Sequence, residues 1–306
     1  MQTTDQLIAT GQAAAANGEW STAASAFEAA YQKDQSYDLN LQLVTVLCET
    51  QNFQQASSLA LEYESRYLAT DETASRLISC LCQSQQFIQA RVSAQLRVQT
   101  APKWLEAAKQ QILSAEQAAE STMAQTLTAT MKQFYHLSEL PVPAQISRLA
   151  AAKHLTYAKY LIAAKFLLVD PFLHQLSRVE VLYTLKGLAV AEKVSVVWFD
   201  QKQRSVVPAQ LPVMGADHVS QATQQELQRR LAQQDVSLYE SLQGLLSLQL
   251  MYLYPDPEKI VTNSQKWVEL LIASQTGTLS PNLTVSEQKM LDCQQKIQEL
   301  NLELAE

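Results

Sequence analysis

One segment of the chain gathers residue types that could carry out acid–base chemistry. His154, Tyr157 and Lys165 precede Asp170, and His174 follows four residues later. A histidine beside a carboxylate is a common pair for moving protons near neutral pH. No nucleophilic side chain in this segment is paired with a recognisable base. The pattern therefore favours structural roles, with Asp170 as a helix cap and Tyr157 and Lys165 on a half-buried helix face.

Motifs for metals and nucleotides are missing from the sequence. The four histidines lack the paired spacing of a zinc site, and the six glycines are scattered rather than grouped as in phosphate-binding loops. The cysteines are Cys48, Cys80, Cys82 and Cys293. Because this number and spacing do not fit a disulfide framework, we expect reduced, buried thiols. We predict no catalytic residue, no metal and no cofactor; the alternative is an enzyme or regulator with a site near His154 and His174.

The composition is that of an ordinary globular chain. Of its 306 residues, 47% are hydrophobic and 17% are charged, and the formal net charge is −7. A negative surface repels phosphate backbones, and no cluster of lysine and arginine reverses this, so we expect no nucleic-acid partner. The longest apolar stretches are interrupted by lysine or glutamine and fall short of the ~20 residues of a membrane-spanning helix. Because no secretory leader follows Met1, we expect a cytoplasmic protein.

A repeated phrase marks the first third of the chain. An aromatic residue followed three positions later by alanine occurs at Trp20, Phe53 and Phe87, at intervals of 33 and 34 residues. Further apolar residues follow each aromatic residue at the spacing of one helix face. A small or apolar residue also stands nine positions before each one, so each repeat is predicted to be two packed helices. Gly18 suits a left-handed residue in the turn between them.

This pattern resembles the tetratricopeptide repeat, a 34-residue helical hairpin with an aromatic residue, an alanine and a closing proline at fixed positions. The match covers about residues 4 to 120, and Pro102 takes the place of the closing proline. The resemblance implies a stack of hairpins whose first helices line a concave groove that holds a peptide or protein segment. The groove residues that it implies are Gln12, Gln42, Thr45, Arg76, Ser79, Gln83 and Lys109. Arg76 and Lys109 are only part of the set with which one subgroup grips a terminal carboxylate.

A helical second domain is predicted beyond the repeats. The helices expected there are a long one from Lys103 to about residue 137, one over 146–169, one opened by Asp170 and Pro171, and further ones over 219–234, 238–254 and 257–273, with a last helix capped by Thr284 and Glu287. Two β-branched and aromatic runs, Val194–Phe199 and Ser205–Val207, predict a small hairpin that lies against these helices.

We therefore predict an all-α protein: a tetratricopeptide-like array of helical hairpins followed by a helical second domain with one small β-hairpin. The predicted parts are a repeat domain over 1–118, a helical domain over 119–275 with the hairpin near 194–207, and a linker with a C-terminal helix over 276–306. The layout is similar to uncharacterised tetratricopeptide-repeat proteins of low-GC Gram-positive bacteria, which implies a bacterial scaffold or adaptor. The expected partner is a protein or peptide, with no membrane, and the chain is either a monomer or a homodimer through its C-terminal helix.

Overall fold

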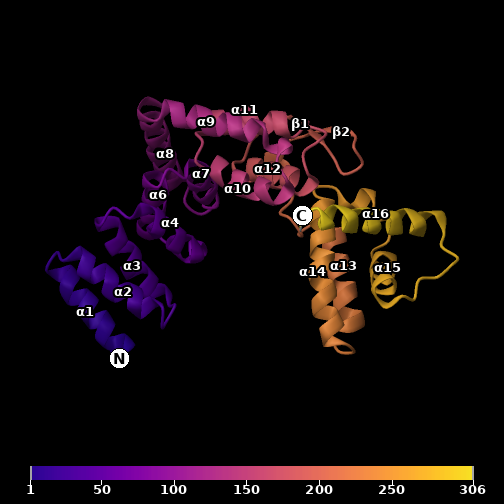
Figure 1. The fold of residues 1–306 in the computed structure, drawn as a ribbon, viewed down its shortest axis with the longest axis horizontal. Coiled ribbons are helices and arrows are strands. Elements are labelled where there is room, and N and C mark those ends of the chain that lie inside the picture. Colours follow the sequence, from indigo (N-terminus) through magenta and orange to yellow (C-terminus); the bar gives the residue numbers. More distant parts are fainter. Residues whose placement is uncertain (1, 305–306) are drawn as a thin grey trace. The chain divides into compact units, whose positions relative to one another are not determined.

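The computed structural model describes residues 2–304 and confirms an all-α fold with one small hairpin. Figure 1 shows the succession of helices and the two-stranded antiparallel sheet of β1 (Val194–Val197) and β2 (Gln203–Val206). The chain divides into two compact units, one of residues 1–132 with 151–160 and the other of 133–150 with 161–306. Among the described residues, no helix combines the length and the apolar character needed to cross a membrane.

The first unit consists of paired helices. These are α1 (Thr4–Ala16), α2 (Trp20–Tyr31), α3 (Tyr37–Glu49), α4 (Phe53–Glu62), α5 (Glu64–Tyr67), α6 (Asp71–Gln83), α7 (Phe87–Gln95) and α8 (Pro102–Thr122), with most of α9 (Ala124–Tyr135) and the first turn of α11 (Tyr157–Leu167). Each aromatic residue of the repeated phrase is the first residue of the second helix in a pair, as Trp20 is in α2, Phe53 in α4 and Phe87 in α7. The predicted repeat period is therefore the period of the helical hairpins.

The turns inside the three hairpins share one backbone conformation. Gly18, Gln51 and Gln85 stand at equivalent places and have φ angles of 75°, 58° and 61°. In each turn the next residue donates its N–H to the carbonyl five residues earlier. This is the hydrogen bond of a Schellman helix end, which needs a residue in the left-handed region. The second and third hairpins thus keep the geometry of the first without its glycine.

Glycine is expected to stabilise the second and third turns. A glutamine in the left-handed region brings its Cβ close to the following carbonyl, whereas glycine has no such contact. We expect the double substitution Gln51→Gly and Gln85→Gly to raise the free energy of unfolding by about 1 kcal/mol, measured by chemical denaturation. Gly18→Ala is the matched reverse change and should lower it by about 1 kcal/mol. A double variant less stable than the parent would contradict this reading of the turns.

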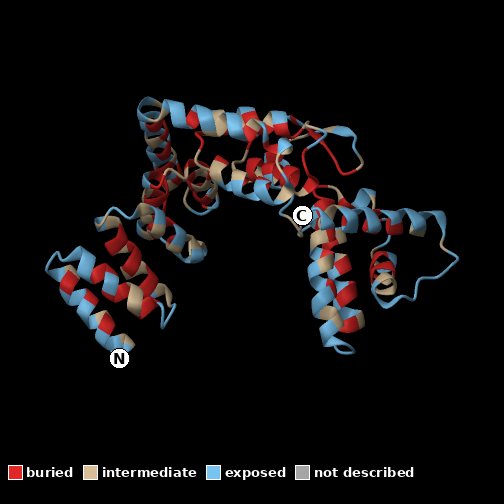
Figure 2. Cartoon of the chain, in the orientation of Figure 1, coloured by how far each residue is buried: buried red, intermediate tan, exposed pale blue. Residues whose placement is uncertain are grey.

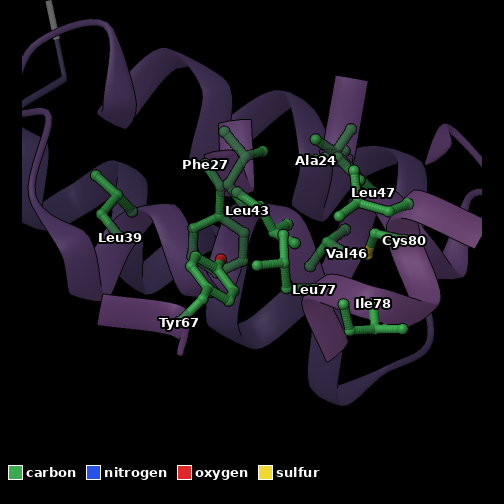
Figure 3. Packing of buried hydrophobic residues seen from close by; sticks show 14 of the residues in the cluster. Ala24, Phe27, Leu39, Leu43, Val46, Leu47, Tyr67, Leu77, Ile78 and Cys80 are labelled. Atoms are coloured by element: carbon green, nitrogen blue, oxygen red, sulfur yellow. The ribbon is translucent and has the colours of Figure 1, made fainter. Parts of the chain in front are cut away.

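A continuous apolar core runs through the paired helices. Ala23, Ala56 and Ala90, the alanines of the repeated phrase, are completely buried. Figure 2 shows buried residues along the sides by which these helices face one another. Figure 3 shows part of the same cluster, with Phe27 of α2 beside Leu43 of α3. Because one helical pair cannot cover its own apolar face, the stacking of pairs stabilises the unit.

The second unit consists of helices with the small hairpin beside them. Its helices are most of α10 (Val142–Ala152), the remainder of α11, α12 (Gln175–Gly187), α13 (His218–Leu231), α14 (Val236–Tyr252), α15 (Ser264–Thr276) and α16 (Val285–Leu302), with 3-10 turns at Leu137–Glu139, Pro208–Gln210 and Pro257–Lys259. Trp198, which follows β1, is buried and donates its Nε1–H to the carbonyls of Leu253 and Tyr254 at 3.2 Å. The hairpin therefore lies against the helices, as predicted.

The C-terminal helix contributes to the core of the second unit. Met290, Cys293 and Ile297 of α16 are buried in one apolar cluster with Trp267 of α15. The side-chain amide of Gln294 also donates to the carbonyl of Trp267 at 2.9 Å. Three apolar residues of the helix that the sequence allowed as a homodimer contact are thus covered within the chain itself.

Two predicted helices are interrupted in the structure. The long helix after Pro102 breaks at Met123, so α8 and α9 are separate helices, and residue 118 lies inside α8 rather than between elements. The stretch over 146–169 also contains two helices, α10 and α11, with a turn between them. Neither break carries glycine or proline, so the local sequence gives no sign of it. Helix propensity is a weak guide that tertiary context can override, which fits both breaks.

Two predicted helix starts are also wrong. Asp170 does not cap a helix: its carboxylate accepts the N–H of Phe172 in a turn, and α12 begins only at Gln175. Pro257 opens a 3-10 turn, while α15 begins at Ser264 after Asn263 has capped it. Aspartate followed by proline suits both a short turn and a helix start, so this signal alone does not separate the two. The capping box of Thr284 and Glu287 is confirmed.

Candidate functional site

The predicted groove residues follow the first helices of the pairs. They are Gln12 on α1, Gln42 and Thr45 on α3, Arg76, Ser79 and Gln83 on α6, and Lys109 on α8. The spacings of three and four residues within α3 and α6 place the members of each helix on one face. Gln12 and Gln83 are exposed, and the other five residues are partly buried. The set therefore combines polar groups with partial shelter from solvent.

Two hydrogen bonds connect these residues between neighbouring helices. The side-chain amide of Gln12 donates to Oε1 of Gln42 at 3.1 Å, which joins α1 to α3. The guanidinium of Arg76 donates to the hydroxyl of Thr45, which joins α6 to α3. The structure thus brings Gln12 together with Gln42, and Thr45 together with Arg76.

The cations of this surface have acidic neighbours on their own helices. Nη2 of Arg76 lies 3.8 Å from Oε1 of Glu72, and Nζ of Lys109 lies 3.1 Å from Oε1 of Glu106. A site that grips a free carboxylate needs cations whose charge is available to it. These contacts partly balance the charge of both cations, and the other five groove residues are neutral amides and hydroxyls.

A pocket of about 240 Å³ opens between α1, α2 and α3 at one end of this surface. Its lining residues are Gln12, Ala15, Trp20, Phe27, Gln42, Thr45 and Val46. Trp20 is 36% exposed, whereas the equivalent Phe87 is 1% exposed. Aromatic and aliphatic groups in the pocket suit an apolar side chain, and the neighbouring amides and hydroxyl suit a peptide backbone.

Trp20 is the site residue that sequence reasoning missed. Its place in the repeated phrase identified it only as a packing residue, and it does begin α2 like its equivalents. It also borders a second hollow of about 410 Å³ together with Gly18 and Glu49. The available signal was its size, because tryptophan replaces the phenylalanine of the other two repeats and presents more aromatic surface.

His154 and His174 are held separately, in different compact units. Nδ1 of His154 lies 3.2 Å from the carbonyl oxygen of Gln85, and Nε2 of His174 lies 3.3 Å from that of Leu300. Burial lowers the pKa of His174 and so favours its neutral ring. Within residues 2–304, no group of three histidine, cysteine or acidic side chains is placed to hold a metal ion. Each histidine is thus held by a backbone carbonyl of its own unit.

A buried ion pair joins α7, α8 and the first residue of α11. Nε and Nη2 of Arg91 donate to the two carboxylate oxygens of Glu116 at 2.8 and 2.5 Å. The same carboxylate accepts the N–H of Tyr157 at 3.0 Å, and the guanidinium of Arg91 lies 5.0 Å from the centre of the Tyr157 ring. The cluster borders an open hollow of about 420 Å³. Two N–H groups of Arg91 and both carboxylate oxygens of Glu116 are thus engaged in contacts that join these helices.

Comparison with known proteins adds no family or relative to these observations. No protein-family model matches the chain, and neither a curated protein nor a solved structure matches it. The pocket beside Trp20 and the polar surface that continues from it are the candidate binding features of the first unit.

Proposed function

We propose that the first unit is a tetratricopeptide-like array that binds an extended segment of another protein in the bacterial cytoplasm. The observation that carries the proposal is the pocket beside Trp20, because Gln12, Gln42 and Thr45, three of the implied groove residues, line it. The equal turn geometry of the three hairpins supports the array. In this proposal one apolar side chain of the partner enters the pocket, and its neighbouring peptide groups exchange hydrogen bonds with the amides.

The chemistry of the surface favours an internal, weakly charged segment of the partner. Beyond the bond that joins them, the side-chain amides of Gln12 and Gln42 keep further donor hydrogens and acceptor lone pairs, which match the N–H and C=O groups of an extended peptide. Arg76 already donates to Thr45 and lies near Glu72. A terminal carboxylate would have to compete with these contacts, so a chain end is the less favoured ligand.

Site-specific photo-cross-linking in cells tests the proposal. A photoreactive phenylalanine analogue in place of Gln42 is expected to cross-link one protein through a single short segment. The same analogue in place of Gln54, an exposed glutamine on the second helix α4, is the matched control and should not capture that protein. Equal capture at both positions, or no capture at Gln42, would overturn the proposal.

Affinity for the captured segment gives the quantitative prediction. A synthetic peptide with that sequence should bind the full chain, and Trp20→Ala should weaken binding at least tenfold, which corresponds to about 1.4 kcal/mol. Calorimetric titration measures both affinities, and Gln54→Ala should leave the value of the parent unchanged. Peptide binding that does not respond to Trp20→Ala would place the segment elsewhere on the protein.

A further inference from the structure

Two cysteines of consecutive hairpins face each other between α3 and α6. The Sγ atoms of Cys48 and Cys80 lie 2.9 Å apart, although 32 residues separate them along the chain. Both are free thiols in the structure. Figure 3 shows Cys80 beside Leu47, the residue that precedes Cys48 in α3. Because a disulfide bond is about 2.05 Å long, an approach of roughly 1 Å would allow these sulfur atoms to bond.

The two thiols differ in access and in acidity. Cys48 is partly exposed, whereas Cys80 is 1% exposed. The hydrogen bond with Cys80, supported by the positive charge of Arg76, holds the pKa of Cys48 below its usual range even though burial opposes this. The same hydrogen bond, together with burial, raises the pKa of Cys80. Cys48 is thus suited to attack as a thiolate, and Cys80 to respond as the second thiol.

We propose that Cys48 and Cys80 are a redox-active dithiol that reacts with low-molecular-weight disulfides such as oxidised glutathione. The Cys48 thiolate attacks one sulfur of the reagent, which forms a mixed disulfide and releases one glutathione thiolate. Cys80 then loses its proton to solvent and attacks Sγ of Cys48, which expels the second glutathione thiolate. Two protein thiols are oxidised to one disulfide, and one glutathione disulfide is reduced to two thiols.

Formation of the mixed disulfide on Cys48 makes the attack by Cys80 easier. While Cys48 is a thiolate, its hydrogen bond and its negative charge hold the proton on Cys80. Once Sγ of Cys48 is bonded to glutathione, this charge is gone, so the proton of Cys80 is released more readily. Cys82 and Cys293 are not part of such a hydrogen-bonded thiol pair. Burial raises the pKa of each to about 12. Both are therefore poor nucleophiles at neutral pH and serve as internal controls.

Thiol counting by mass spectrometry tests the proposal on the full chain. The protein is treated with oxidised glutathione near neutral pH, denatured and alkylated. We expect two of the four thiols to be lost with no glutathione retained, and peptide mapping to find Cys48 linked to Cys80. Because such a bond constrains the unfolded chain, the treated protein should also melt about 5 °C higher, and dithiothreitol should reverse the shift. Four remaining thiols, or a bond between any other pair, would overturn the proposal.

Single variants separate the two steps. Cys80→Ser should stop the reaction at a stable glutathione adduct on Cys48, and Cys48→Ser should leave all its remaining thiols unmodified. Cys82→Ser and Cys293→Ser should still form the bond between Cys48 and Cys80. A glutathione adduct that persists on Cys48 in the parent protein would show that Cys80 does not reach it, and it would contradict the proposal without the use of any variant.

Discussion

Glu116→Ala is expected to lower the free energy of unfolding of the first unit by about 3 to 5 kcal/mol. The Glu116 side chain is 6% exposed, and its carboxylate balances the charge of Arg91, which is itself only 20% exposed. Its removal leaves a cation with little water around it and leaves the N–H of Tyr157 without its acceptor. Because the chain has two compact units, hydrogen exchange of peptides from α7 and α8 is the appropriate measurement, as it reports on the unit concerned.

A carboxylate one helical turn further along α8 provides the matched control. Glu120 lies 2.9 Å from Nζ of Lys159 and accepts the hydroxyl of Thr156, but its side chain is 37% exposed. Glu120→Ala should cost about 1 kcal/mol or less, because water screens the pair and replaces the lost partner. Equal losses for Glu116→Ala and Glu120→Ala would show that burial does not set the strength of these contacts.

A second variant distinguishes the unpaired charge from loss of packing. The double substitution Arg91→Met and Glu116→Gln removes both charges and keeps an amide oxygen that can accept the N–H of Tyr157. It should recover more than half of the loss seen with Glu116→Ala, because replacing a buried ion pair by neutral groups of similar volume is often nearly neutral. If the double variant is as unstable as Glu116→Ala, the contact of Arg91 with the Tyr157 ring contributes more to the free energy of unfolding than the charge pair does.

The repeat period explains how much of the first unit could be predicted from the sequence. Helix pairs, turns and buried alanines recur with the aromatic phrase, so their places follow from spacing alone. The ion pair of Arg91 and Glu116 could not be predicted this way, because it joins residues 25 apart that occur in only one repeat. The break at Met123 was likewise missed, since good helix formers surround it. Such features depend on tertiary packing rather than on the local pattern.

In the candidate site, too, some contacts could be predicted from the sequence and others could not. The hydrogen bond of Gln12 with Gln42 was foreseeable, because the resemblance places both on the lining face of first helices. The contact of Cys48 with Cys80 was not foreseeable, because the two cysteines do not stand at equivalent positions of their repeats. Cys48 lies five residues before Phe53, whereas Cys80 lies seven residues before Phe87. Their contact depends on the crossing of α3 and α6, which spacing does not define. Sequence periodicity therefore identifies faces, and only the packed structure identifies pairs between different faces.

Gly11→Val is expected to destabilise the first unit by about 3 kcal/mol. A Cβ atom on Gly11 would lie 2.8 to 2.9 Å from three carbons of the Phe27 ring, which is closer than real side chains pack. Phe27 is 2% exposed and packed in the core cluster, so relief of the clash would displace its ring from that packing. Hydrogen exchange in α1 and α2 measures the loss, and Gly244→Val, where an added Cβ meets no atom within 4 Å, is the control that should cost less than 1 kcal/mol.

Adding Phe27→Ala to Gly11→Val should restore much of this stability. The other repeats place Val44 and Ile78 where the first has Gly11, and they place Ala60 and Ala94 where it has Phe27. All four are buried, so each repeat combines one large and one small residue at these two positions, and the first repeat has them in the opposite order from the other two. Phe27→Ala alone should leave a cavity and cost about 3 to 5 kcal/mol. The double variant should be more stable than either single variant, because it gives the first repeat the same pair of residues, valine and alanine, that the second repeat has at these positions. Strictly additive losses of stability would mean that the two positions do not share one packing site.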